Sequence, residues 1–119
     1  MRPIQDALPL LQTPRKIFIT THHKPDGDAI GSMLGLAHYL FHRSTTLIGP
    51  NCYLQDLYTA QAARGKGVGR ALIHAVYERA QAAGAPRVYW QTHETNLTAM
   101  RLYDSVADRS GFVVYSKKF

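Results

Sequence analysis

The sequence has only one cysteine, Cys52, among its 119 residues. A single cysteine excludes an internal disulfide framework and any zinc site that needs several thiolates. No apolar run is long enough to span a membrane, and the N-terminus lacks the apolar segment of a signal peptide. Repeats, low-complexity tracts and Gly/Ser linkers are also missing. We therefore expect a cytoplasmic chain that forms one compact domain over residues 1–119 and has no membrane partner.

Acidic residues are few, since 8 Asp and Glu stand against 14 Lys and Arg and leave a formal net charge of +6. The densest cationic spot consists of Arg64, Lys66 and Arg70, inside a glycine-rich stretch. Such a concentration fits a small ligand that carries phosphate better than a broad nucleic-acid surface. We expect a small-molecule cofactor and no nucleic-acid partner.

Apolar patterns predict strands that alternate with helices. The predicted strands lie at 16–21, 52–58, 87–92 and 111–117, and the predicted helices at about 29–40, 68–83 and 96–106. This order is typical of the α/β class. We expect a single three-layer domain with about four main, mostly parallel strands and helices on both faces.

The stretch GLAHYLFHRST, residues 35–45, fits two structures. Together with Ile30 and Met33, its apolar residues follow helical spacing, but Leu36, His38, Leu40 and His42 also alternate with Ala37, Tyr39 and Phe41 as in a strand. Because Asp28 is well placed as an N-cap and the apolar stripe is continuous, we expect a helix up to Leu40 or Phe41.

The stretch THHKPDGDAIGS, residues 21–32, presents His22, Asp26 and Asp28 before a predicted helix N-terminus. An imidazole and two carboxylates suit Mn²⁺ or a similar ion. The alternative is ordinary turn chemistry at Pro25-Asp26-Gly27, with Asp28 serving only as a helix cap.

The spacing of His22, two residues and Pro-Asp-Gly-Asp-Ala-Ile-Gly-Ser resembles the N-terminal motif of DHH-family phosphoesterases of the oligoribonuclease type. The resemblance covers about residues 1–40 and implies an α-β-α unit with His22, Asp26 and Asp28 as metal ligands. That family also needs a further Asp, an Asp-His-His triplet and a second domain, and the sequence has no Asp-His-His. We therefore expect at most a weak, vestigial metal site, no manganese cofactor and no nuclease activity.

The stretch ARGKGVGRAL, residues 63–72, is a glycine-rich turn between a predicted strand and a long predicted helix. Gly65, Gly67 and Gly69 let backbone N–H groups approach phosphate oxygens, and the helix dipole adds positive potential. Glycines at this spacing also serve tight packing. The stretch is not a P-loop, because no Lys-Ser/Thr follows the final glycine.

The surrounding sequence CYLQDLYTAQAARGKGVGRALI resembles the cofactor-binding segment of GCN5-related N-acetyltransferases (GNAT). Their Arg-x-x-Gly-x-Gly pattern falls on Arg64, Gly67 and Gly69, and their second motif on Asn96, Ala99, Leu102-Tyr103 and Gly111-Phe112. The resemblance covers about residues 35–119. It implies acetyl-CoA or CoA binding, with pantetheine on Leu57, Tyr58 and Thr59, Asn96 near its arm, and Tyr103 as general acid. The pyrophosphate would lie on Arg64, Gly65, Lys66, Gly67, Val68, Gly69 and Arg70. Asn96 also suits a helix cap, and Tyr103 also suits a core position.

Two resemblances thus meet in one domain-sized chain without a linker, and neither supplies a full active site. We interpret the chain as an engineered or recombined chimera: residues 1–40 would be phosphoesterase-like, residues 41–119 acetyltransferase-like with the order β-α-β-α-β, and the crossover would lie near 35–40. Acetyl transfer would then be absent or weak and Tyr103 vestigial. The alternatives are a purely structural chimera without a ligand, and a working N-acetyltransferase of a small amine. An unprotected sheet edge would favour a homodimer.

Overall fold

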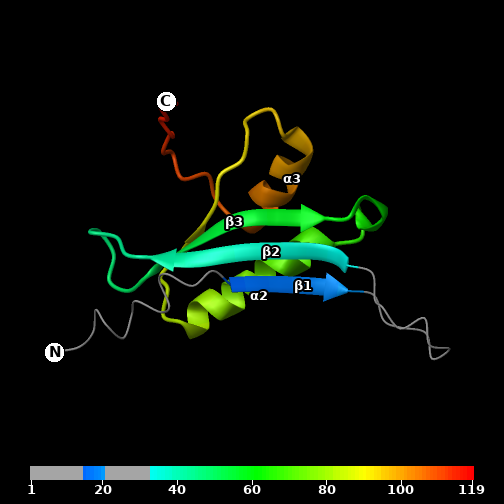
Figure 1. Ribbon diagram of the computed structural model, residues 1–119, viewed down its shortest axis with the longest axis horizontal. Helices are drawn as coiled ribbons and strands as arrows, with labels where there is room; N and C mark the ends of the chain where they lie inside the picture. Colours follow the sequence, from blue (N-terminus) through cyan, green and yellow to red (C-terminus); the bar gives the residue numbers. More distant parts are fainter. Residues whose placement is uncertain (1–14, 21–32) are drawn as a thin grey trace.

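The structure is a computed structural model that describes residues 15–20 and 33–119. Four strands form one sheet in the order β1-β2-β3-β4. Figure 1 shows the three long strands β1, β2 and β3 side by side. Along the chain the elements are β1 Arg15–Thr20, β2 Met33–His42, β3 Asn51–Thr59, the short 3₁₀ turn η1 Gln61–Ala63, α2 Val68–Ala82, β4 Val88–Tyr89 and α3 Leu97–Val106. The predicted α/β class and the expected number of about four strands are confirmed.

The expectation of a mostly parallel sheet is wrong. Strand β2 runs antiparallel to both β1 and β3, and only the β3–β4 pair is parallel. A parallel pair needs a crossover connection, which here is supplied by α2 between β3 and β4. Strands β2 and β3 are joined by residues 43–50 alone, and such a short connection produces antiparallel neighbours.

The helix expected up to Leu40 is also wrong, because residues 33–42 form strand β2. This strand lies between β1 and β3 and pairs with both, so its backbone groups are bonded on two sides. Its alternation then decides which side chains are buried: Ala37, Tyr39 and Phe41 are at most 2% exposed. Cross-strand pairing has therefore overridden the helical spacing of the same residues.

Helix α2 packs along the sheet and forms the core with its inner face (Figure 1). The largest fully buried side chains of the core are Phe41, Leu72, Ile73, Val76 and Cys52. Burial raises the pKa of the Cys52 thiol to about 11, so the thiol stays protonated and behaves as a small apolar group.

A second helical layer is not found among the described residues. Helix α3 packs against α2, where the Tyr77 hydroxyl donates to the carbonyl of Val106 at 2.9 Å. On the face of the sheet opposite to α2, Phe18 and Tyr58 remain 55% and 47% exposed. We expected helices on both faces of the sheet, and in the described part of the chain helices cover one face only.

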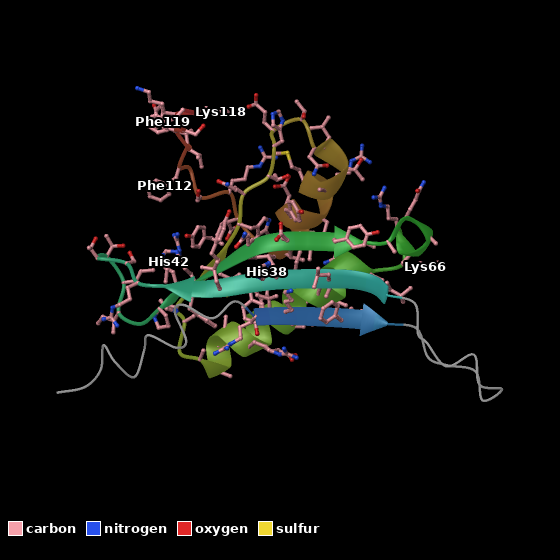
Figure 2. The ribbon with its side chains drawn as sticks, viewed as in Figure 1. His38, His42, Lys66, Phe112, Lys118 and Phe119 are labelled. Carbon is pink, nitrogen blue, oxygen red and sulfur yellow. The ribbon has the colours of Figure 1, made fainter. Side chains whose placement is uncertain are left out.

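The predicted strand at 111–117 does not form, and the segment 107–119 has no regular structure. Its apolar side chains, among them Phe112 and Tyr115, are exposed (Figure 2). The strand predicted at 87–92 is reduced to two residues, Val88 and Tyr89. Both predictions rested on β-rich composition, and a strand also needs a neighbour to pair with.

Gly35 lies where β2 passes closest to α2. A Cβ atom added at Gly35 would lie 2.6 Å from Cγ1 of Val68 and 2.8 Å from Cδ1 of Leu72. We expect Gly35→Ala to lower the free energy of unfolding by roughly 1–3 kcal/mol, because the packed core must move to admit the methyl group. Urea denaturation measures the change. Gln81→Ala, at an exposed position of α2, is the control, and its free energy of unfolding should differ from that of the parent by less than about 0.5 kcal/mol. Equal stability of the two variants would contradict the close approach of β2 and α2 at Gly35.

Candidate active site

The glycine-rich loop leads into α2 through two left-handed residues, Gly65 with φ 79° and Gly67 with φ 81°. Gly67 is the N-cap of α2, no side chain caps the helix, and its first turn has no acidic residue. The first bond of the helix runs from the N–H of Ala71 to the carbonyl of Gly67 at 3.0 Å. The amides of Val68, Gly69 and Arg70 therefore have no helical acceptor and can bind an anion.

Three cationic side chains surround this helix start. Arg64 and Lys66 are exposed on the loop, which lies beyond the end of β3 (Figure 2). Arg70 is engaged, since its guanidinium donates to Oγ of Ser105 on α3 at 2.9 Å. Positive charge and unpaired amides thus coincide at the position that the sequence predicted for a pyrophosphate.

Strand β3 pairs with β4 only near its beginning and runs on to Thr59 without it. Only two residue pairs join them, Cys52 with Val88 and Tyr53 with Tyr89. The N–H of Ala60 donates to the carbonyl of Leu34 on β2 at 2.7 Å. Because backbone groups alternate along a strand, those of Leu57 and Thr59 point away from β2, to the side where β4 no longer pairs. They are available to an extended ligand.

Gly69 brings the loop, the end of β3 and α3 together. A Cβ atom added at Gly69 would lie 3.2 Å from Cδ2 of Leu102 and 3.6 Å from Oγ1 of Thr59. The structure therefore places the start of α2, the strand end at Thr59 and the α3 residue before Tyr103 next to one another.

Tyr103 is half-buried and packs edge-on against Trp90, with ring centroids 5.4 Å apart. Burial raises the pKa of the Tyr103 phenol above its ordinary value, so the hydroxyl is protonated at neutral pH. Asn96 is the N-cap of α3, but its side chain makes no capping bond. Its amide nitrogen instead lies 3.3 Å from Oγ1 of Thr92, to which it donates.

The other proposed ligand set, His22, Asp26 and Asp28, lies outside the described residues. Within residues 15–20 and 33–119 no group of three His, Cys, Asp or Glu side chains could hold a metal ion. Nor does this part of the chain contain a helix that is long and apolar enough to cross a membrane.

Sequence reasoning missed a contact between His38 and Asp56. Nδ1 of His38 lies 3.2 Å from Oδ2 of Asp56 across the β2–β3 pair. Simple alternation would place Gln55 and Asp56 on opposite faces of the sheet. The register shifts between His38 and Tyr39, however, which leaves Gln55 as an extra residue in β3. The Asp56 side chain is exposed, whereas that of His38 is half-buried. The strand pattern of residues 35–42 was the signal that could have placed His38.

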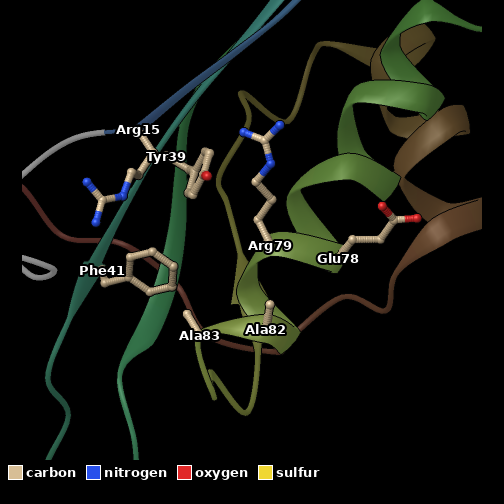
Figure 3. A pocket seen from close by; sticks show the side chains of 7 residues that line it. All are labelled: Arg15, Tyr39, Phe41, Glu78, Arg79, Ala82 and Ala83. Carbon is tan, nitrogen blue, oxygen red and sulfur yellow. The ribbon is translucent and has the colours of Figure 1, made fainter.

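A cavity of about 470 Å³ lies elsewhere, between β2 and the C-terminal end of α2 (Figure 3). It is lined by Arg15, Tyr39, Phe41, Glu78, Arg79, Ala82 and Ala83. Gly67 and Arg79 are separated by about 18 Å along the helix, at 1.5 Å per residue. The cavity is therefore distinct from the glycine-rich loop.

Comparison with known proteins identifies the family. The family model described as "Acetyltransferase (GNAT) family" matches residues 2–107. A D-amino-acid N-acetyltransferase of Saccharomyces cerevisiae is 44% identical over 87 residues, which are 73% of this chain and 54% of that protein. The chain thus spans about half the length of this curated relative.

Two solved structures show the same fold. An integron cassette protein from the mobile metagenome of V. cholerae is 27% identical with a TM-score of 0.67, over 73% of this chain and 55% of that one. A ribosomal-protein-alanine N-acetyltransferase from Brucella melitensis is 17% identical with a TM-score of 0.72, over 97% of this chain and 79% of that one.

These matches correct the interpretation of the chain as a chimera. The family model begins at residue 2 and runs through the segment that was assigned to a phosphoesterase, and the comparisons give no support to a phosphoesterase component. The expectation of an engineered protein, and its alternative of a structural chimera without a ligand, are wrong for the same reason. The expectation of absent or weak transfer rested on the chimera and loses its basis with it. The chain belongs to the GNAT family of acetyltransferases, whose members use acetyl-CoA.

Proposed function

We propose that this chain binds acetyl-CoA at the start of α2 and transfers the acetyl group to the amino group of a small acceptor. The observation that carries the proposal is the uncapped N-terminus of α2, with left-handed Gly65 and Gly67 before it and the cations Arg64 and Lys66 beside it. The acceptor class is taken from the relative of known activity, which is named as a D-amino-acid N-acetyltransferase.

The residues at this site fit the chemistry of the cofactor. Unpaired amides of Val68, Gly69 and Arg70 suit the oxygens of a pyrophosphate, and Arg64 and Lys66 suit its charge. The backbone groups of Leu57 and Thr59 suit the amides of a pantetheine arm. When bound, acetyl-CoA supplies an acetyl thioester that an amine can attack.

Tyr103 and Asn96 complete the proposed site. The protonated phenol of Tyr103 gives a proton to the departing thiolate, because burial against Trp90 keeps its pKa high. The Asn96 side chain makes no capping bond, and while its amide nitrogen donates to Thr92, its amide oxygen can hold the cofactor arm near α3.

Removing the loop cations should weaken cofactor binding. We expect the double variant Arg64→Ala/Lys66→Ala to raise the Kd for acetyl-CoA at least about tenfold, since a charge-assisted hydrogen bond contributes about 1.5–3 kcal/mol. Isothermal titration calorimetry measures this Kd. Arg79→Ala removes the same kind of charge at the other end of α2 and should leave the Kd within about twofold. A parent chain that does not bind acetyl-CoA would contradict the proposed function.

A further inference from the structure

Three charged or titratable side chains lie in one row across the sheet. Lys16 of β1 pairs in register with His38 of β2, and His38 pairs with Asp56 of β3. The next row consists of Ile17, Ala37 and Leu57, whose side chains belong to the core or pack against it. Since side chains alternate along strands, the row Lys16–His38–Asp56 faces away from α2.

The middle of the row is organised by a hydrogen bond. His38 presents Nδ1 to Oδ2 of Asp56 at 3.2 Å, and its side chain is 20% exposed, whereas that of Asp56 is 61% exposed. Nε2 of His38 is buried and has no partner among the described residues. The imidazole therefore holds one oxygen of the carboxylate and leaves the more exposed part of Asp56 open to another donor.

The row ends at the strand to which the proposed function assigns the pantetheine arm. Asp56 directly precedes Leu57, whose backbone faces the opening between β3 and β4. The extra residue Gln55 turns the strand at this point, so that Asp56 shares a face with His38. His38 lies in the middle of β2 (Figure 2). An amine held by Asp56 would therefore lie beside the end of the cofactor.

An apolar row lies next to the charged one on the same face. Phe18 pairs with Leu36, and Leu36 pairs with Tyr58. Phe18 is 55% exposed and Tyr58 is 47% exposed, so both rings present apolar surface. Exposed apolar surface beside fixed charges suits a small ligand that has an apolar group as well as an ionic one.

We infer that the row Lys16–His38–Asp56 is the acceptor site and that it accepts an α-amino acid. Asp56 receives the ammonium beside the cofactor strand, Lys16 receives the carboxylate from the far side, and Phe18 and Tyr58 contact the side chain. Lys16 and Asp56 are two strand spacings apart, about 10 Å, which leaves room for a compact zwitterion between their side-chain ends. This inference rests on the proposed function.

The row also accounts for the proton that must leave the acceptor. One proton passes from the ammonium to the carboxylate of Asp56, which frees the nitrogen lone pair. The nitrogen then forms a bond to the carbonyl carbon of the thioester, and the bond from that carbon to sulfur breaks. The second proton passes from the nitrogen to water, and the sulfur receives a proton from Tyr103, so the products are an acetamide and a thiol. Tyr103 and Asp56 return to their starting states by exchanging a proton each with water. His38 acts here as a positioning residue for Asp56.

Binding of two matched acceptors tests the inference. The chain is saturated with CoA and titrated by calorimetry with D-alanine and with D-alaninamide, which lacks the carboxylate. We expect Lys16→Met to raise the Kd for D-alanine about tenfold and to leave that for D-alaninamide unchanged, while Lys16→Arg restores the affinity. Asp56→Asn should raise the Kd values for both acceptors by the same factor. Lys117→Met, on the exposed C-terminal segment, is the charge-matched control and should change neither of the two Kd values.

The positioning role of His38 is tested by comparing the effects of its substitutions on kcat and on KM. His38→Gln retains a donor for Asp56 and should keep most of the turnover, whereas His38→Leu should lower kcat with little change in the KM for acetyl-CoA. Equal kcat values for the two His38 variants would overturn the assignment. So would an equal rise in the Kd values for D-alanine and D-alaninamide in Lys16→Met. Failure of the CoA-loaded chain to bind D-alanine would overturn it while leaving the proposed function standing. Failure to bind CoA would contradict the proposed function. D-alanine would then be titrated into the unloaded chain: binding that Lys16→Met weakens would support the acceptor site, and no binding would overturn it.

Discussion

Leu72→Ala is expected to lower the free energy of unfolding by about 2–5 kcal/mol. Leu72 is 0% exposed and lies on the face of α2 that packs against the sheet. Truncating it removes apolar contacts and leaves a cavity that a close-packed core fills only in part. Since a domain of this kind is stable by about 5–15 kcal/mol, the loss is a large share of the total.

Urea denaturation followed by circular dichroism measures the effect as a lower midpoint with an unchanged slope. Leu97→Ala is the matched control, because Leu97 begins α3 and is 65% exposed. We expect that variant to change the stability by less than about 1 kcal/mol. If the two leucine variants lost equal stability, α2 could not be packed on the sheet as described.

Tyr103→Phe is expected to lower kcat about 10²- to 10⁴-fold and to leave the Kd for acetyl-CoA nearly unchanged. The proposed role of Tyr103 is to protonate the leaving thiolate, and phenylalanine keeps the ring that packs on Trp90. Because burial raises the pKa of the Tyr103 phenol, this proton is retained at pH values up to and beyond the ordinary tyrosine pKa of about 10. Thiol release from acetyl-CoA in the presence of D-alanine measures kcat.

Tyr77→Phe separates loss of a proton donor from loss of structure. Its hydroxyl also lies near α3, but it donates to the carbonyl of Val106 and has no role in the proposed reaction. We expect Tyr77→Phe to lower the stability by about 1 kcal/mol and to keep kcat. Equal kcat values for Tyr103→Phe and the parent would contradict the role of Tyr103 as the proton donor to the thiolate.

The sequence predicted well what local signals determine. Helix α2 and the strand before it were placed within about two residues, because Gly67 begins the helix, its apolar stripe is regular, and Gly84 and Pro86 follow its end. The positive φ values of Gly65 and Gly67 have the same origin, since glycine adopts them without steric cost. The loop and its cations could be predicted for that reason.

Strand β2 could not be predicted in this way. Residues 35–41 satisfy the spacing of a helix and of a strand, and the choice depends on β1 and β3, which pair with β2 from either side. The contact between His38 and Asp56 depends on the same pairing and on the extra residue Gln55, which no local pattern reveals. The chimera interpretation had another origin, since it rested on two motif resemblances that meet in one chain, and the family model that matches residues 2–107 overturned it.

Chemical-shift mapping with CoA tests the central claim most directly. In ¹H–¹⁵N spectra of the labelled chain, we expect saturating CoA to shift the amides of residues 64–70 most strongly, followed by those of Leu57 and Thr59. The amides around the cavity at Arg15 and Arg79 should shift little. Shifts concentrated at that cavity, with the amides of residues 64–70 unchanged, would contradict the assignment of the cofactor to the start of α2.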